Sequence, residues 1–428
     1  MKTLYKNCTL LDGTPDMSPI PGSSVLVDDD RILAVYTEKD GPKSTDGNIV
    51  DLNGAYLLPG FVNLHIHVPA DGKPKKKETD NAKKVRILTS NPLTRYLVRK
   101  MCEKYVLTEL LSGCTTVRAV GGVQKYDSDL RDDINSGKLD GPRMLVANMA
   151  ISVPGGHMAG SLAYEALSED HARELVRIIA KDKPDLIKLM ITGGVLDAKK
   201  VGEPGVLRMP ASYVKAACDE AHKLGFYVAA HVESPEGVKV ALENGVDTIE
   251  HGAKMDDEMI SLFKEHGAKL VTTLSPALPY ALFDRSVSYC TEMAQENGKI
   301  VFEGIIDCAI NALKNDIPVG LGTDTGCPFI THYDMWREIN YYVKYCGVSS
   351  TYALHTATLG NAKIIGIDNE TGSIEPGKSA DFIVCKENPL EDLSRLRQLE
   401  LVVFRGKAYE HPKIKKMQKV ENELDKWL

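Results

Sequence analysis

Eight short apolar runs, separated by segments with helical periodicity, constrain the fold of this chain more than any other sequence feature. The alternation extends from residue 57 to about residue 366, and Gly, Pro or Asp bounds the runs. Such alternation predicts an α/β fold with a parallel sheet covered by helices, and eight units are the number that a (β/α)8 TIM barrel requires. The runs are 58–64, 115–117, 144–147, 186–189, 227–230, 248–250, 270–272 and 319–322.

The segments between the runs carry apolar residues at three- and four-residue spacing, the period of a helix with one buried face. Pro210 and Pro235 stand where first-turn prolines are favoured. Helices are therefore predicted over 168–183, 210–225, 256–267 and 291–316.

The two ends of the chain differ from this middle part. Residues 1–56 and 367–412 hold short β-like runs with turn residues and little helical periodicity. We expect them to pair into one small composite β-domain, a β-sandwich, beside a barrel formed by 57–366. Residues 413–428 are rich in Lys and Glu and predict a C-terminal surface helix.

Composition excludes several classes of protein. The 428 residues are 43% hydrophobic and 26% charged, which is ordinary for a globular chain. Asp and Glu (59) outnumber Lys and Arg (52), which argues against binding of nucleic acid through its phosphates. No apolar stretch is long enough to cross a membrane, and Lys6 and Asn7 interrupt any signal-peptide core at the start, so we expect a cytoplasmic protein. Nine Cys without a C-x-x-C motif predict reduced thiols.

A basic segment, Lys73-Pro74-Lys75-Lys76-Lys77-Glu78, lies between the first two runs. We interpret it as a solvated loop, because charge runs usually are solvated. The alternative is an anion-binding loop near the barrel mouth.

The first run ends in the sequence His65-Ile66-His67. Residues i and i+2 of a strand point to the same side, so two imidazoles project together and can chelate one metal ion. His-x-His pairs are also common without a metal, so this pair alone does not identify a site.

Lys188 stands in the middle of the apolar fourth run, where an unpaired ammonium group is strongly disfavoured. One interpretation pairs it with a buried carboxylate. The other is a desolvated Lys with a lowered pKa that reacts with CO2 and forms a carbamate, an anion able to bridge two metal ions.

Three further potential ligands follow other runs. His231 and His251 close the fifth and sixth runs, and Asp324 follows the eighth. With His65, His67 and Lys188 they make six candidates at the C-terminal ends of predicted barrel strands, where barrel enzymes place their active sites. Their shared position makes coincidence improbable.

These six residues resemble the metal set of the amidohydrolase superfamily, in the subtype with two metals bridged by a carboxylated lysine. The resemblance covers nearly the whole chain. It includes the entry to the first strand at 58–63, the post-barrel helix at 356–362, and the return into the β-domain at 372–382.

The resemblance implies that His65, His67 and Asp324 hold the more buried of two divalent metal ions, and that His231 and His251 hold the more exposed one. Carboxylated Lys188 would bridge them. Zinc is expected because neutral His ligands suit it, with manganese, cobalt or iron as alternatives. It also implies that a metal-bridging hydroxide attacks the substrate, while Asp324 accepts its proton and passes it to the leaving amine.

More narrowly, 115–118, 154–157, 187–195 and 249–252 resemble the imidazolonepropionase-related branch, with metallo-dipeptidases and carboxypeptidases acting on Xaa-Pro or Xaa-Arg/Lys bonds and ochratoxin-type amidases. Imidazolonepropionase itself matches less well, because its mononuclear site has no carboxylated lysine. Two departures concern substrate identity: Ala119 stands where relatives often have an acid, and 232–237 is unusually acidic. Glu233 and Glu236 in that stretch would favour a basic leaving residue, or would simply suit the dipole of a helix.

His157 follows Pro154-Gly155-Gly156 and, by similarity, is a second candidate catalytic residue, polarising the carbonyl or contacting a substrate carboxylate. The alternative is a loop His with a structural hydrogen bond. Arg208 and Tyr213 are weaker candidates for holding a C-terminal carboxylate.

We therefore expect a metal-dependent hydrolase that cleaves the amide bond of dipeptides or N-acyl amino acids, of the Xaa-Pro or Xaa-Lys/Arg dipeptidase type. Its partners would be a small-molecule substrate and further copies in a homo-oligomer. A lactonase, phosphotriesterase or cyclic-amide hydrolase is an alternative on the same site, and a non-catalytic amidohydrolase-like scaffold is an alternative of another class. Motifs for other mechanisms (G-x-S-x-G, H-E-x-x-H, P-loop) are absent from the sequence.

Overall fold

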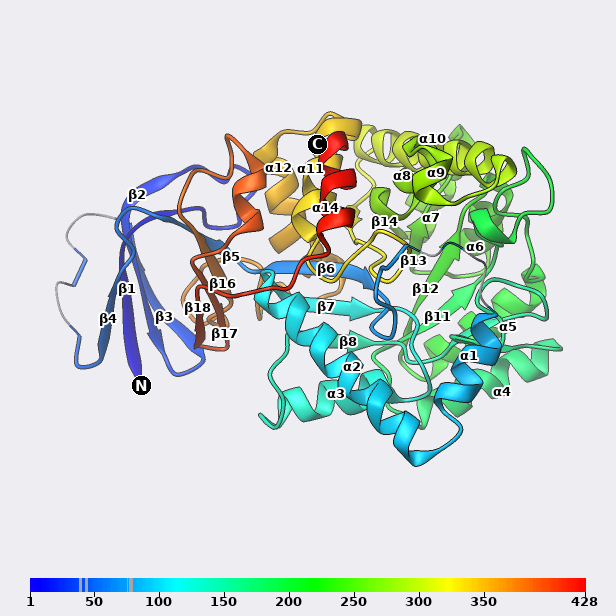
Figure 1. Cartoon of the computed structure of the whole chain (residues 1–428), viewed down its shortest axis with the longest axis horizontal. Helices are drawn as coiled ribbons and strands as arrows, with labels where there is room; N and C mark the ends of the chain where they lie inside the picture. Colours follow the sequence, from blue (N-terminus) through cyan, green and yellow to red (C-terminus); the bar gives the residue numbers. More distant parts are fainter. Residues whose placement is uncertain (38–40, 43–44, 75, 77–79) are drawn as a thin grey trace.

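The computed structural model describes residues 1–37, 41–42, 45–74, 76 and 80–428. Two regions lie side by side: an eight-stranded sheet at one end of the molecule, and a larger region of parallel strands surrounded by helices (Figure 1). The α/β class with parallel sheets is thus confirmed.

The eight-stranded sheet contains strands from both ends of the chain. Its order is β18-β17-β16-β5-β1-β2-β3, with β4 paired to β1. All eight strands belong to one hydrogen-bonded sheet with its own buried cluster, so a sandwich of two sheets is not confirmed. The strands are β1 Lys2–Leu10, β2 Ile20–Asp28, β3 Arg31–Tyr36, β4 Asn48–Asp51, β5 Tyr56–Pro59, β16 Phe382–Cys385, β17 Leu401–Phe404 and β18 Lys407–Glu410.

The parallel strands form two sheets, of order β6-β7-β8 and β10-β9-β11-β12-β13-β14-β15. They are β6 Phe61–Ile66, β7 Cys114–Ala119, β8 Arg143–Val146, β9 Ala150–Ser152, β10 Ala163–Glu165, β11 Leu186–Met190, β12 Tyr227–Val232, β13 Thr248–His251, β14 Lys269–Thr272 and β15 Val319–Leu321. Seven of the eight predicted runs match one strand each. The first run is divided between two strands at Gly60, because Leu58 pairs in the eight-stranded sheet and not in the parallel ones.

The two parallel sheets meet beside β6. Asp324 N donates to His65 O at 2.8 Å, and His67 N donates to Thr325 O at 2.9 Å. On the other side β11 pairs with β9 and not with β8, so strand pairing is not continuous around all eight strands and the barrel is not closed.

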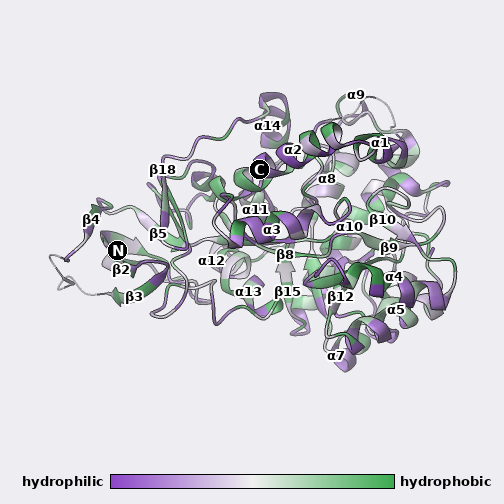
Figure 2. Cartoon of the chain, turned by 90° about the horizontal axis from the view of Figure 1, so that it is seen from below, coloured by the Kyte–Doolittle hydropathy of each residue, from purple (hydrophilic) through white to green (hydrophobic). Residues whose placement is uncertain are grey.

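The four predicted helices are present, each shorter than expected by one to three residues at an end. They are α4 Glu169–Ala180, α5 Ala211–Lys223, α7 Asp257–His266 and α10 Glu292–Lys314. Ser168, Asp256 and Thr291 cap three of them by accepting a backbone N–H. Such helices carry both hydrophilic and hydrophobic residues (Figure 2), and α4 buries Ala172, Leu175, Val176 and Ile179 on one face.

Further helices cover the strands and connect them. They are α1 Asn81–Leu88, α2 Pro92–Leu111, α3 Tyr126–Asn135, α6 Pro235–Glu243, α8 Leu274–Leu282, α9 Arg285–Ser288, α11 Met335–Cys346, α12 Ser350–His355, a π-helical segment Thr356–Gly360, and α13 Asn361–Ile364. Within the described part of the chain, no helix combines the length and the apolar character of a membrane span. None of the nine cysteines, all of them described, forms a disulfide.

The basic segment after the first run is only partly described. Lys75, Lys77 and Glu78 lie outside the described residues. Lys73 Nζ lies 2.7 Å from Asp71 Oδ2, and Lys76 Nζ lies 5.6 Å from the centre of the Tyr289 ring.

The C-terminal segment is fixed to the helical region by buried charge. Its helix α14, Gln418–Leu424, continues into a 3-10 turn, Asp425–Trp427, and lies over α11 (Figure 1). The fully buried Arg337 of α11 lies 3.1 Å from Glu421 Oε1 and 2.7 Å from Asp425 Oδ1, and its Nε donates to Asp334 at 3.0 Å. The segment thus completes a buried ion cluster.

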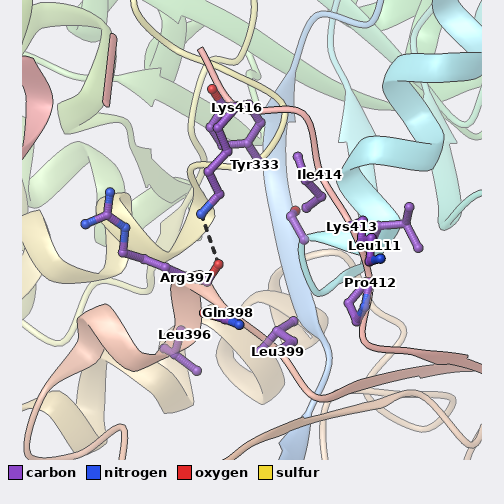
Figure 3. A pocket seen from close by; sticks show the side chains of 11 residues that line it. Leu111, Tyr333, Leu396, Arg397, Gln398, Leu399, Pro412, Lys413, Ile414 and Lys416 are labelled. Atoms are coloured by element: carbon purple, nitrogen blue, oxygen red, sulfur yellow. Dashed lines mark hydrogen bonds between the residues drawn. The ribbon is translucent and has the colours of Figure 1, made fainter. Parts of the chain in front are cut away.

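A cavity of about 280 Å³ lies beneath the chain that leads into α14. Residues 412–414 and Lys416 line it together with Tyr333, Arg397 and Leu399, and Lys416 Nζ donates to Arg397 O at 3.1 Å (Figure 3). None of the six predicted metal ligands lines this cavity.

We expect Arg337→Met to lower the free energy of unfolding by about 3–5 kcal/mol, because it leaves the buried Asp334 without its cation and the buried Glu421 with Arg397 alone. Urea unfolding followed by tryptophan fluorescence measures this directly, since Trp336 and Trp427, the only two tryptophans, belong to this region. The control Lys426→Met removes an exposed ion pair with Glu423 and should change the value by less than about 1 kcal/mol. Equal effects of the two substitutions would contradict the role of the buried cluster.

Candidate metal centre

The six predicted ligands lie in or just after parallel strands. Three lie within a strand, one ends a strand, and two follow one. All six are buried. They are His65 in β6 and His67 just after it, Lys188 in β11, His231 in β12, His251 at the end of β13, and Asp324 after β15.

The first two histidines both face the carboxylate of Asp324. His65 Nε2 lies 3.5 Å and His67 Nε2 3.3 Å from the same carboxylate oxygen, Oδ1. That oxygen is buried and has no hydrogen-bond partner among the described residues. Burial opposes ionisation of Asp324, but the neighbouring His65 and His67 outweigh it and hold its pKa well below the usual range.

The other two histidines form a second group with a carboxylate. One ligand atom from each of His231, Glu233 and His251 lies within 4.8 Å of the others. The His231 and His251 rings lie 4.7 Å apart, and the His65 and His251 rings 5.0 Å apart, so the two groups adjoin. Burial, followed by the charge of Asp324, raises the pKa of Glu233 to about 8.

Lys188 is fully buried in the middle of β11, and its Nζ has no hydrogen-bond partner in the described chain. Burial lowers its pKa to about 8, although Glu250 acts in the opposite direction. No carboxylate forms an ion pair with it among the described residues, so the interpretation of a Lys paired with a buried acid is not supported by a contact.

A charged network lies directly below the histidines. Arg118 of β7 donates through Nη2 to both oxygens of Glu250 of β13, at 2.7 and 2.8 Å. Glu250 Oε2 also lies 2.8 Å from His65 Nδ1. Burial alone would raise the pKa of Glu250, but Arg118 and Lys188 hold it below its usual range.

Hydrogen bonds at Nδ1 orient His67 and His251, whereas His231 has its Nε2 3.4 Å from Gly193 O. His67 Nδ1 lies 2.8 Å from Gly121 O, and His251 Nδ1 lies 2.6 Å from Thr273 Oγ1. These partners leave Nε2 of His65 and His67 facing Asp324 and fix the ring planes. For His65, burial and the charge of Lys188 lower the pKa to about 4, which keeps the imidazole neutral and able to bind a metal.

Close backbone packing brings Asp324 to the first strand. A Cβ at Gly322 would lie 2.4 Å from His65 Cβ, so only glycine allows the segment after β15 to approach β6. His251 and Asp324 themselves have positive φ values of 68° and 53°, an uncommon conformation that re-aims each side chain at the strand end.

His157 lies at the edge of the site. Its ring stacks on that of His231 with centroids 4.1 Å apart, and its Nδ1 lies 2.5 Å from Asp197 Oδ2. Arg208 has a buried Nε without a hydrogen-bond partner among the described residues. Tyr213 is directed elsewhere, since its hydroxyl donates to Leu167 O at 2.9 Å.

Two charged residues of the site, Arg118 and Glu250, were not predicted. Arg118 directly follows the second apolar run and Glu250 ends the sixth, so a charged residue next to a buried run was the available signal. Glu233 and Glu236 were expected near the barrel mouth; the carboxyl group of Glu233 lies with the histidines, whereas Glu236 is exposed in the first turn of α6.

The donor set fits divalent metal ions. It combines neutral imidazole nitrogens, a carboxylate oxygen without a partner, and a buried amine without a partner. Buried polar atoms normally have hydrogen-bond partners. Several buried polar atoms without a partner in one site therefore indicate a ligand that binds them.

Comparison with known proteins supports this interpretation. A model described as the Amidohydrolase family matches residues 56–409. A Bifidobacterium longum protein provisionally assigned as a prolidase has a crystal structure with a TM-score of 0.87, 33% identity, and coverage of 99% of this chain and 98% of its own. A crystal structure of a Xaa-Pro dipeptidase with bound methionine has a TM-score of 0.83 and 30% identity, and the match covers 96% of this chain and 100% of that one.

A relative with a named activity is the ochratoxinase of Aspergillus niger. It is 24% identical over 436 residues, which cover 93% of this chain and 85% of that protein. Because the family model spans most of the chain and the similar structures span nearly all of it, the chain belongs to the amidohydrolase family, in a dipeptidase-like branch.

Proposed function

We propose that this protein is a metal-dependent hydrolase that cleaves the amide bond of dipeptides or N-acyl amino acids, of the Xaa-Pro or Xaa-Lys/Arg dipeptidase type. The observation that carries the proposal is the convergence of His65, His67 and Asp324 with His231 and His251 around the unpaired Lys188. Similarity to a Xaa-Pro dipeptidase and to an ochratoxinase adds support for an amide substrate.

His65, His67 and Asp324 would hold one divalent ion, and His231 and His251 a second. Lys188, as a carbamate formed with CO2, would join the two and replace a buried ammonium by an anion. Zinc suits the imidazole donors. When bound, such ions activate a water molecule near neutral pH and polarise the scissile carbonyl group.

Asp324 is the residue placed to move the proton. Its Oδ2 accepts from Cys327 Sγ at 3.4 Å, while Oδ1 faces the two histidines. A carboxylate in this position can accept a proton from the attacking water and return it to the leaving amine, which must be protonated to depart.

His157 is proposed to contact the substrate. Asp197 holds its Nδ1 and thereby sets the tautomer and the ring orientation. Its Nε2 would then polarise the substrate carbonyl or contact a substrate carboxylate.

We also propose that the two parallel sheets form one (β/α)8 barrel. The bonds between β6 and the segment after β15 join them on one side, and Asp185 N donates to Val146 O at 2.8 Å on the other. The boundaries 1–56 plus 367–412 for a β-domain, 57–366 for the barrel and 413–428 for a C-terminal helix stay predictions, as do the cytoplasmic location and the homo-oligomer.

Lys188→Met should remove the carbamate and the bridge between the ions. We expect loss of bound metal and a fall in turnover of about 10²-fold or more. Metal content by mass spectrometry, and the ¹³C resonance of the carbamate in protein equilibrated with ¹³C-bicarbonate, measure this independently of activity. The exposed Lys181→Met should change neither. Full metal content and activity in Lys188→Met would exclude the bridging role.

Metal-loaded protein should hydrolyse members of a dipeptide library or N-acyl amino acids, with the preferred C-terminal residue defining the substrate. The same preparation is tested with lactones, a phosphotriester and cyclic amides. Turnover confined to that second panel would replace the peptidase by the alternative hydrolase. Less than one metal ion per chain after growth with zinc, without any turnover, would favour a non-catalytic scaffold.

A further inference from the structure

Glu233 is a carboxylate that the six-residue metal set does not include. It follows β12 by one residue and stands two residues after His231. One of its oxygens lies within 4.8 Å of a ring nitrogen of His231 and of one of His251. Its Oε2 is buried and has no hydrogen-bond partner in the described part of the chain.

Contacts with neighbouring segments fix the main chain at Glu233. Its N–H donates to Thr192 Oγ1 at 3.0 Å, which ties it to the end of β11. Gly205, with a φ of +66°, packs against its carbonyl so closely that a Cβ there would lie 2.3 Å from the carbonyl oxygen. The next residue, Ser234, caps α6 by accepting Gly237 N–H. These contacts fix the backbone from which the Glu233 side chain extends.

The carboxyl group has no protein cation to balance it. No Lys or Arg forms an ion pair with it among the described residues, and none contributes to the shift of its pKa. Its charged neighbours include Asp324 and Asp197, both acidic. A buried carboxylate beside other acids is strongly unfavourable unless it takes up a proton or a cation occupies the space that the acids share.

We infer that Glu233 is a further protein ligand of the metal ion held by His231 and His251. The inference rests on the proposed metal centre and adds a residue to it. A carboxylate oxygen adds negative charge and a hard donor to a pair of imidazoles, which strengthens binding of a divalent ion and widens the choice toward harder ions such as manganese. It also provides the missing partner for Oε2.

The test compares Glu233→Gln with Glu236→Gln, a matched control three residues later that removes an exposed carboxylate from the same helix start. Apoprotein is titrated with Co²⁺ against a competing chelator, and the visible spectrum and the stoichiometry are recorded. We expect Glu233→Gln to bind one of two ions roughly tenfold more weakly or worse and to change the spectrum of that ion. Glu236→Gln should match the wild type, and Glu233→His, which restores a donor, should recover part of the affinity.

Wild-type affinity for both ions and an unchanged spectrum in Glu233→Gln would overturn the inference. If the KM for dipeptides with a free amine rises in that variant while N-acyl substrates are unaffected, Glu233 contacts the substrate ammonium instead. Failure of the wild type to bind two ions would overturn the proposed metal centre itself, so the two failures are distinguishable. Thermal unfolding of each variant shows whether it is folded.

Discussion

The site depends on how three buried charges inside the parallel strands are balanced. Arg118 and Glu250 neutralise each other through a two-oxygen contact, a geometry that strengthens a charge-assisted hydrogen bond. Lys188 lies in the same interior without a hydrogen bond. An interior with one unsatisfied cation is unfavourable, and the proposed carbamate removes that cation while creating a metal-binding anion.

The same charges orient the ligands. Because Glu250 accepts from His65 Nδ1, it determines which nitrogen of that ring faces Asp324, and Arg118 in turn holds Glu250. Neutral partners orient the rings of His67 and His251 in the same way: a backbone carbonyl for His67 and a hydroxyl for His251. The proposed metal centre would thus be preformed by residues that do not touch the ions, as is usual for such sites.

The parallel strands could be predicted because they depend on local signals, and the same signals single out the six candidate donors, whose role stays a prediction. A short segment of sequence is enough to recognise an apolar run, the polar residues at its end, and the side to which alternate side chains of a strand point. The division of the first run at Gly60 was not predicted, since the apolar pattern continues across it while the pairing partner changes to β16. For Glu233 the sequence offered a basic leaving residue or a helix dipole as its partner. Its position beside His231 and His251 depends on how the segment after β12 packs against Gly205 and Thr192, which no local pattern predicts.

Distant parts of the chain also contribute to the position of Asp324. Trp427 stacks on Phe283, and Phe283 contacts Phe329 with ring centres 5.0 Å apart. Phe329 lies in the loop after Asp324, and its N–H donates to Gly72 O at 2.7 Å, in the loop after His67. The loops that carry two ligands are therefore packed together and covered by the C-terminal segment. Since Asp324 itself has a strained positive φ, such surrounding contacts are what can hold it in that conformation.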